Sequence, residues 1–228
     1  MNKYLLPVCA AGLLFSNHSQ AAVTISANNS GGAGFNLPAN SIVRVAFIPG
    51  PQDNVGDPAY AATYARLTGN DFADIRTLVK FLGSDNPDAG SGTSGLSGGT
   101  APSTVLPTGK FTFKAEGISG AYLPQNERLY VFVTDSASLN PSAWAILSNN
   151  DSTNGAPDWV APFNDPTLGG SLTMAMTSSR LNDADDVLRG IVTPGQTSGG
   201  TIGLVPVPEP SSIALLGLLG LGFLRRRR

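Results

Sequence analysis

Short apolar runs separated by turn residues recur along the chain. Residues 41–48 and 128–134 are nearly continuous β-branched and apolar runs, whereas residues 110–118 and 171–177 alternate apolar and polar side chains. Runs of this length, bounded by Gly, Pro and Asn, predict β-strands. We expect 128–134 to be a central strand and 143–147 to be a buried one.

Weaker patterns predict the remaining strands. Residues 23–27 alternate and predict an edge strand, and residues 158–163 predict a short edge strand in which Pro162 limits pairing. Residues 201–205 predict a last short strand. Residues 179–189 have no strand pattern and are predicted to form a helical turn or a loop.

Residues 57–82 interrupt the β pattern with two predicted helices. The first, residues 58–67, is alanine-rich and begins with a proline. The second is capped by Asn70 or Asp71 and is expected to end at a C-cap formed by Gly83. Its apolar face, predicted to pack on the sheet, consists of Phe72, Ile75, Leu78, Val79 and Leu82.

Many short strands with one helical region predict a mostly β fold. The expected architecture is an antiparallel, β-sandwich-like domain with a short helical insertion. The chain has 228 residues, which is enough for one domain with its own core after both ends are removed.

The first segment has the three parts of a secretory signal peptide. Lys3 supplies a basic start and residues 5–15 supply an apolar stretch. Ser19 and Ala21 are small residues at the positions that signal peptidase reads, so cleavage is predicted after Ala21 or Ala22. The apolar stretch is too short for a permanent membrane span.

The last part of the chain combines three features in a fixed order. First comes a Pro-Glu-Pro sequence, then an uncharged apolar run, then an arginine cluster. This order resembles the sorting signal of PEP-CTERM proteins, and the resemblance implies processing near Pro-Glu-Pro by an exosortase. The residues that carry it are Pro208, Glu209, Pro210, Arg225, Arg226, Arg227 and Arg228.

The apolar run is predicted to be a transmembrane helix over about residues 211–224. Arginines remain on the cytoplasmic side, so the body is expected outside the inner membrane. The twelve uncharged residues 213–224 cover only about 18 Å of a hydrocarbon core about 30 Å thick, which suits a temporary anchor. The alternative is an ordinary single-span anchor in which Pro-Glu-Pro occurs by chance.

The two ends define the predicted organisation. Residues 1–21 are a signal peptide, 22–205 a β-rich extracytoplasmic domain and 206–228 the sorting signal. The resemblance implies export in a Gram-negative bacterium, C-terminal anchoring in the inner membrane, and later transfer to the cell surface or the extracellular matrix. The expected partners are signal peptidase, exosortase, the inner membrane and exopolysaccharide.

We define the body as residues 22–207. Its composition excludes several kinds of functional site. The only cysteine, Cys9, and the only histidine, His18, lie in the predicted signal peptide. The body therefore has no means of forming a disulfide, a Cys/His zinc site or a Ser-His-Asp triad.

Charge argues against nucleic acid as a partner. The chain has 14 Lys and Arg and 16 Asp and Glu. Leaving out Lys3, Glu209 and the four terminal arginines gives the body 9 basic and 15 acidic residues, a net charge of −6. A negative body is repelled by phosphate backbones.

The acidic residues of the body suggest two kinds of site. A carboxylate-based glycosidase needs two acidic groups, and Glu116 and Glu127 are its only glutamates, with no motif that pairs them. The aspartates at 183, 185 and 186 form an acidic cluster, which we interpret as a solvated turn or a helix start rather than a calcium site. We therefore expect no catalytic residue, metal or cofactor.

Aromatic side chains suggest a carbohydrate contact. Trp144 lies in an apolar run and is expected in the core, whereas Trp159 follows Asp158 in a turn-rich segment and is the better candidate for stacking on a sugar ring. The leading hypothesis is a non-enzymatic surface or matrix protein. The alternatives are a carbohydrate-binding module and a glycosidase.

Overall fold

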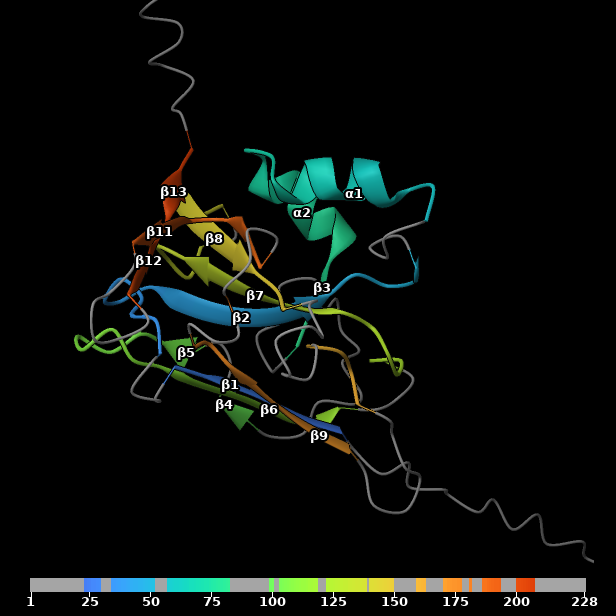
Figure 1. The fold of residues 1–228 in the computed structure, drawn as a ribbon, viewed down its shortest axis with the longest axis horizontal. Coiled ribbons are helices and arrows are strands. Elements are labelled where there is room, and N and C mark those ends of the chain that lie inside the picture. The colour runs from blue at the N-terminus through green and yellow to red at the C-terminus, as the bar shows by residue number, and fades with distance from the viewer. Residues whose placement is uncertain are drawn as a thin grey trace, which may run out of the picture.

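The computed structural model describes residues 23–29, 34–51, 57–82, 99–100, 103–118, 122–138, 140–149, 159–162, 170–177, 181, 186–193 and 200–207. Within these ranges the chain forms two main sheets and two short helices, stacked as three layers (Figure 1). The prediction of a mostly β fold with a helical insertion is confirmed for this part of the chain.

The smaller sheet has the strand order β4-β6-β1-β9. Its strands are β4 (Gly99–Thr100), β6 (Thr112–Ile118), β1 (Val23–Asn28) and β9 (Gly170–Ala175). The pairing of β1 with β9 is parallel, and the other pairings in this sheet are antiparallel.

The larger sheet is antiparallel and has the path β10-β8-β7-β2-β3. These strands are β10 (Val187–Arg189), β8 (Ala143–Leu147), β7 (Leu129–Thr134), β2 (Ile42–Phe47) and β3 (Lys80–Phe81). Two further short strands add to it: β13 (Val205–Pro206) pairs with β8, and β5 (Ser103–Thr104) pairs with β2. A separate pair consists of β11 (Ile191–Thr193) and β12 (Thr201–Gly203).

The central strands of the larger sheet are buried on both faces. In β2, Val43 and Val45 face the smaller sheet, whereas Ala46 faces the helices. In β7, Val131 and Phe132 divide in the same way. Two apolar clusters result, one between the sheets and one, the helix-side core, beneath the helices. This explains why these strands are apolar runs without alternation.

Helices α1 (Tyr60–Leu67) and α2 (Phe72–Leu78) cover the outer face of the larger sheet (Figure 1). The Oδ1 atom of Asp71 accepts a hydrogen bond from the Asp74 backbone N–H at 3.1 Å, which confirms the predicted N-cap. The ring of Phe72 meets the rings of Phe132 and Trp144 edge to face, with centroid separations of 6.3 and 5.2 Å. Phe72, Ile75 and Leu78 thus pack on the sheet as predicted, whereas the other two residues of the predicted face, Val79 and Leu82, lie beyond the helix.

The predicted end of α2 at Gly83 is wrong. The helix stops at Leu78, Val79 is extended, and Lys80 and Phe81 pair with β2. The ring of Phe81 contacts that of Phe132 at a centroid separation of 5.4 Å. Pairing with the sheet and burial of this ring replace another helical turn, and Gly83 itself lies outside the described residues.

Other strand predictions need correction. The predicted edge strand 23–27 lies inside its sheet, because β9 pairs with the side of β1 that β6 leaves free. Part of 179–189, predicted as turn or loop, forms β10. The predicted strand 158–163 contributes a single bridge in the described residues, from Val160 to Arg128. Segment 201–205 divides between β12 and β13.

We expect Phe132→Ala to lower the free energy of unfolding of the body by about 3–5 kcal/mol, because it removes a fully buried ring that contacts Phe72 and Phe81. The exposed Ile191 provides a matched control, since Ile191→Ala should change stability by no more than about 0.5 kcal/mol. Urea denaturation measures both. Equal effects would contradict the helix-side core.

Candidate functional site at the end of the folded body

The last described residues are held on the edge of the larger sheet. Val205 pairs with Trp144 and Pro206 with Ala143. Beyond the strand, the Val207 N–H donates a hydrogen bond to the Ser142 carbonyl at 2.8 Å. The Val207 side chain also packs against the helix-side core. The fold therefore extends to Val207.

Strand β13 completes the cover of β8. Strand β7 occupies one side of β8, while β10 pairs with its C-terminal half through Leu147 and Ile146. Strand β13 pairs with the N-terminal half, through Trp144 and Ala143. Pro206 is exposed and has no N–H, which suits a strand that is itself at the edge.

The loop before β8 presents the carbonyl that Val207 uses. Asp135 accepts hydrogen bonds from the Ser142 backbone N–H, at 3.2 Å, and from the Ser142 hydroxyl. The Asp135 N–H in turn donates to the Ala143 carbonyl at 3.0 Å. One carboxylate thus fixes Ser142 and, through its carbonyl, the end of the body.

A buried arginine joins β13 to the helices. The side chain of Arg189 is 7% exposed, and its guanidinium carbon lies 4.2 Å from the centroid of the Trp144 ring. It donates to the Gly69 carbonyl at 2.8 Å, to Asn70 Oδ1 at 2.9 Å and, at 3.4 Å, to the Val205 carbonyl. The connection between α1 and α2 is therefore tied to the last strand.

The electrostatics of Arg189 follow from its burial. Loss of hydration lowers the pKa of Arg189, because the charged form is better solvated in water. The guanidinium nevertheless stays protonated at neutral pH. Carbonyl and amide oxygens and the negative face of the Trp144 ring stabilise this charge.

The two helices are joined by an ion pair near the surface. Arg66 donates from Nη2 to Asp74 Oδ1 at 2.6 Å and from Nε to Asp74 Oδ2 at 2.8 Å. This two-pronged hydrogen bond lowers the pKa of Asp74 and raises that of Arg66. Both side chains are partly exposed, so solvent screens the pair.

The proposed carbohydrate contact at Trp159 is corrected by its burial. The side chain is 1% exposed and belongs to the core between the sheets. Its backbone accepts from the Leu129 N–H and donates to the Asn149 carbonyl, which fixes the residue beside β7. Trp144 is fully buried, as predicted.

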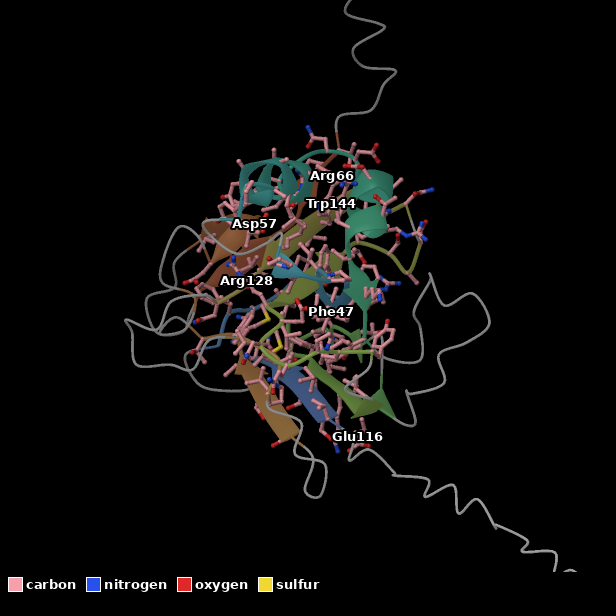
Figure 2. All side chains as sticks on the ribbon, turned by 90° about the vertical axis from the view of Figure 1, so that its right-hand side faces the viewer. Phe47, Asp57, Arg66, Glu116, Arg128 and Trp144 are labelled. Atoms are coloured by element: carbon pink, nitrogen blue, oxygen red, sulfur yellow. The ribbon has the colours of Figure 1, made fainter. Side chains whose placement is uncertain are left out.

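The two glutamates of the predicted glycosidase alternative engage different neighbours. Glu116 lies on β6 and forms an ion pair with Lys114. Glu127 Oε1 accepts from the Gly50 N–H at 3.2 Å, next to Arg128. Figure 2 places Glu116 at the far end of the smaller sheet and Arg128 in the other half of the molecule, so the fold does not bring the glutamates together.

The acidic cluster is only partly described. Residues 183 and 185 lie outside the described residues, and Asp186 is 2% exposed, with its carbonyl accepting from the Ser148 N–H. Asp186 does lie in a turn, but the expectation that it is solvated is wrong, because the residue is buried. No group of three or more metal-ligating side chains occurs in the described ranges.

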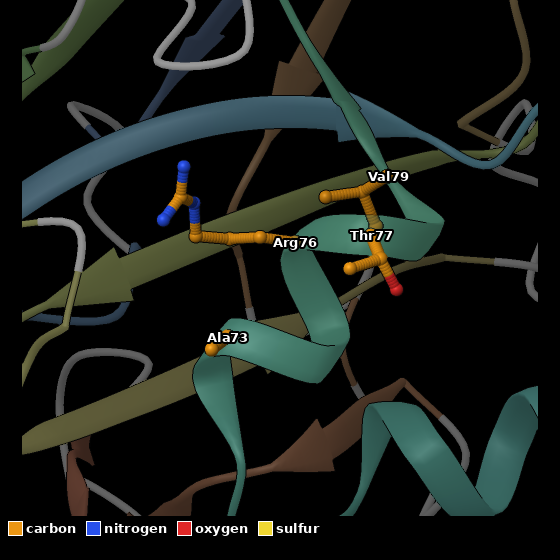
Figure 3. Close-up of a pocket in the computed structure, with 4 residues that line it drawn as sticks. All are labelled: Ala73, Arg76, Thr77 and Val79. Carbon is orange, nitrogen blue, oxygen red and sulfur yellow. The ribbon is translucent and has the colours of Figure 1, made fainter.

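A hollow of about 370 Å³ lies beside α2. The described residues that line it are Ala73, Arg76, Thr77 and Val79 (Figure 3). Arg76 extends along one side of the hollow, while Thr77 and Val79 lie on the other. These side chains include one guanidinium and one hydroxyl but no carboxylate, so they form no acid–base pair.

Residues 206–228 match the PEP-CTERM protein-sorting motif. The chain carries a PEP-CTERM sorting motif. This motif implies export, a membrane-associated C-terminal segment and exosortase-dependent sorting to the cell envelope. No curated protein and no solved structure matches the chain.

Most residues of the motif lie outside the described part of the chain. The same holds for Ser19 and Ala21 of the predicted signal peptide and for the predicted membrane helix 211–224. Among the helices of the described ranges, none has the length and apolar character needed to cross a membrane. The predicted roles of the individual sorting residues therefore stay predictions.

The sequence did not reveal that the sorting motif begins inside the fold. The predicted domain ended at residue 205, whereas Pro206 belongs both to β13 and to the matched motif. Arg189 was also missed, because it was assigned to a turn or loop. The segment formed by Val187, Leu188 and Arg189 is too short for its residue pattern to distinguish a strand from a loop.

Arg189→Ala should lower the free energy of unfolding by about 1–3 kcal/mol, because it removes a buried side chain and leaves the partly buried carbonyls of Gly69 and Val205 without this donor. Amide hydrogen exchange should accelerate at Val207 in particular. Lys114→Ala, at a side chain 49% exposed, is the control. Unchanged exchange at Val207 would show that Arg189 does not hold the last strand.

Asp74→Asn should remove an acid-sensitive part of the stability. The pKa of Asp74 is lowered in the folded state, so its contribution is present above the unfolded pKa of about 3.9 and is lost as the pH falls through the folded value. The stability difference between wild type and Asp74→Asn should therefore shrink in acid. Denaturation at pH 7 and pH 3 tests this, with Asp71→Asn as a control that keeps the cap. A difference independent of pH would exclude the ion pair as its source.

Proposed function

We propose that the protein is a non-enzymatic component of the cell surface or exopolysaccharide matrix. The motif first holds the body at the inner membrane, and exosortase then releases it. The observation that carries this proposal is that the matched motif begins within the last strand of a folded body. The folded body and the sorting motif thus overlap at Pro206, with no linker between them.

Processing near Pro-Glu-Pro agrees with the fold. A cut beyond Val207 leaves β13 on β8 and the Val207 hydrogen bond to Ser142 intact. A cut before Val205 would uncover the edge of β8 at Trp144. Uncovered edge strands pair readily with other chains. A cut beyond Val207 therefore favours a released body that stays soluble.

A structural role is supported by the contacts of the two glutamates and by the composition of the body. Glu116 and Glu127 are engaged with Lys114 and Gly50 in separate parts of the fold. The body also lacks the histidine and cysteine that many nucleophilic mechanisms need. A structural protein that acts through its surface requires neither histidine nor cysteine.

Contact with exopolysaccharide is supported by the outer face of the smaller sheet. Its core face is apolar, but the opposite face carries hydroxyl groups that reach solvent. The Ser26 and Thr173 hydroxyls lie 3.0 Å apart across β1 and β9. Thr24 and Ser171 pair in the same parallel register. Hydroxyl rows of this kind exchange hydrogen bonds readily with sugar hydroxyls.

Intact mass of the protein from its native host tests the sorting route. We expect a mature species that begins near Ala22, ends beyond Val207 and lacks Arg225 to Arg228. In a host without exosortase, the species should keep its arginines and stay in the membrane fraction. A host that contains the enzyme but yields a membrane species ending at Arg228 would contradict release and favour a plain anchor.

A further inference from the structure

The tether between body and membrane is short. Val207 is fixed on the sheet, and the predicted span begins at about residue 211. The three residues between Val207 and Ser211 make four Cα-to-Cα steps, which extend at most about 14 Å. Two of the three are prolines, which stiffen a linker. While the motif is in the membrane, the surface around Val207 must therefore lie close to the bilayer.

The helices lie on that surface. Arg189 bonds both to the Val205 carbonyl and to Gly69 at the connection between α1 and α2. Val207 and Tyr64 pack against the same helix-side core. Figure 1 shows β13 and both helices at the same end of the molecule, with the smaller sheet at the other end.

The charge of the helical segment suits this position. Residues 57–82 contain three acidic and three basic residues, so the rest of the body carries its whole net charge of −6. Anionic lipid headgroups repel that remainder but not the neutral segment. Tyr60 and Tyr64 are half-buried, with ring centroids 6.0 Å apart. Tyrosine is favoured at the membrane–water interface.

We propose that the surface formed by α1 and α2 rests on the outer leaflet of the inner membrane while the motif anchors the chain. This inference rests on the proposed function, because it requires the motif to be in the membrane. The hydroxyl-bearing face of the smaller sheet then points away from the bilayer, toward the compartment that the released body enters. Release removes the tether and with it the contact.

Single cysteines test this orientation, because the body has none of its own. Ala62→Cys lies on the exposed side of α1, and Ser171→Cys lies on the exposed face of the smaller sheet. Each variant of the full mature chain is labelled with a fluorophore and inserted into phosphatidylcholine–phosphatidylglycerol vesicles that contain nitroxide-labelled lipid. We expect loss of fluorescence at position 62 and none at position 171.

A linker variant identifies the cause. A flexible Gly-Ser insertion between Val207 and Pro208 should restore the fluorescence at position 62, because the body is no longer confined to the bilayer. Equal quenching at 62 and 171, or quenching at 171 alone, would overturn the proposed orientation. So would a label at 62 that is unquenched in lipid but protected when exosortase is added, since the surface would then dock on the enzyme.

The proposed sorting route and the proposed orientation on the membrane can be contradicted independently. The quenching at position 62 is measured before any exosortase is added, so it can be observed even if the chain is never cleaved in its host. Conversely, a host that releases a species lacking the arginines supports sorting even if position 62 remains unquenched. The mass measurement therefore tests the route, and the fluorescence tests the orientation.

Discussion

The fold depends on one antiparallel unit, β2-β7-β8, that is buried on both faces. Each of its strands sends alternate side chains into two cores, one against the smaller sheet and one against the helices. In the described part of the chain, the smaller sheet and the helices each pack on one face of this unit. The position of α1 and α2, the course of β3 and the site where β13 attaches all follow from this unit. Burying two faces on one sheet also supplies stability without disulfides.

Strand positions in this unit were predictable from residues such as Val131 and Ile146, because an apolar run flanked by turn residues has few other solutions. The Asp71 cap was predictable for a similarly local reason. The features that the local sequence pattern did not predict depend on contacts between residues far apart in the chain. The first strand is internal because it pairs with β9, which lies far along the chain. Helix α2 stops early because Phe81 packs against Phe132 of the sheet. Trp159 follows turn residues, yet backbone bonds to Leu129 and Asn149 carry it into the core.

In the candidate site, too, some features were predictable from local sequence and others depend on long-range contacts. The sorting motif is local in sequence, so it was recognised from Pro-Glu-Pro, the apolar run and the arginines. Its attachment to the body depends on Arg189, Asp135 and Ser142, which lie far from it in sequence and carry no motif. A buried guanidinium that connects two helices to a terminal strand makes the end of the body a structural element rather than a linker.

The parallel pairing of β1 with β9 has a consequence for the order in which the smaller sheet forms. Strand β1 begins at Val23, so it is the first of the described strands to be synthesised. Its hydroxyl partner for Ser26 is Thr173, 147 residues later in the chain. Closing so long a loop is slow. Strand β1 therefore has its antiparallel partner β6 available well before β9, and the smaller sheet is completed only when this late part of the chain arrives.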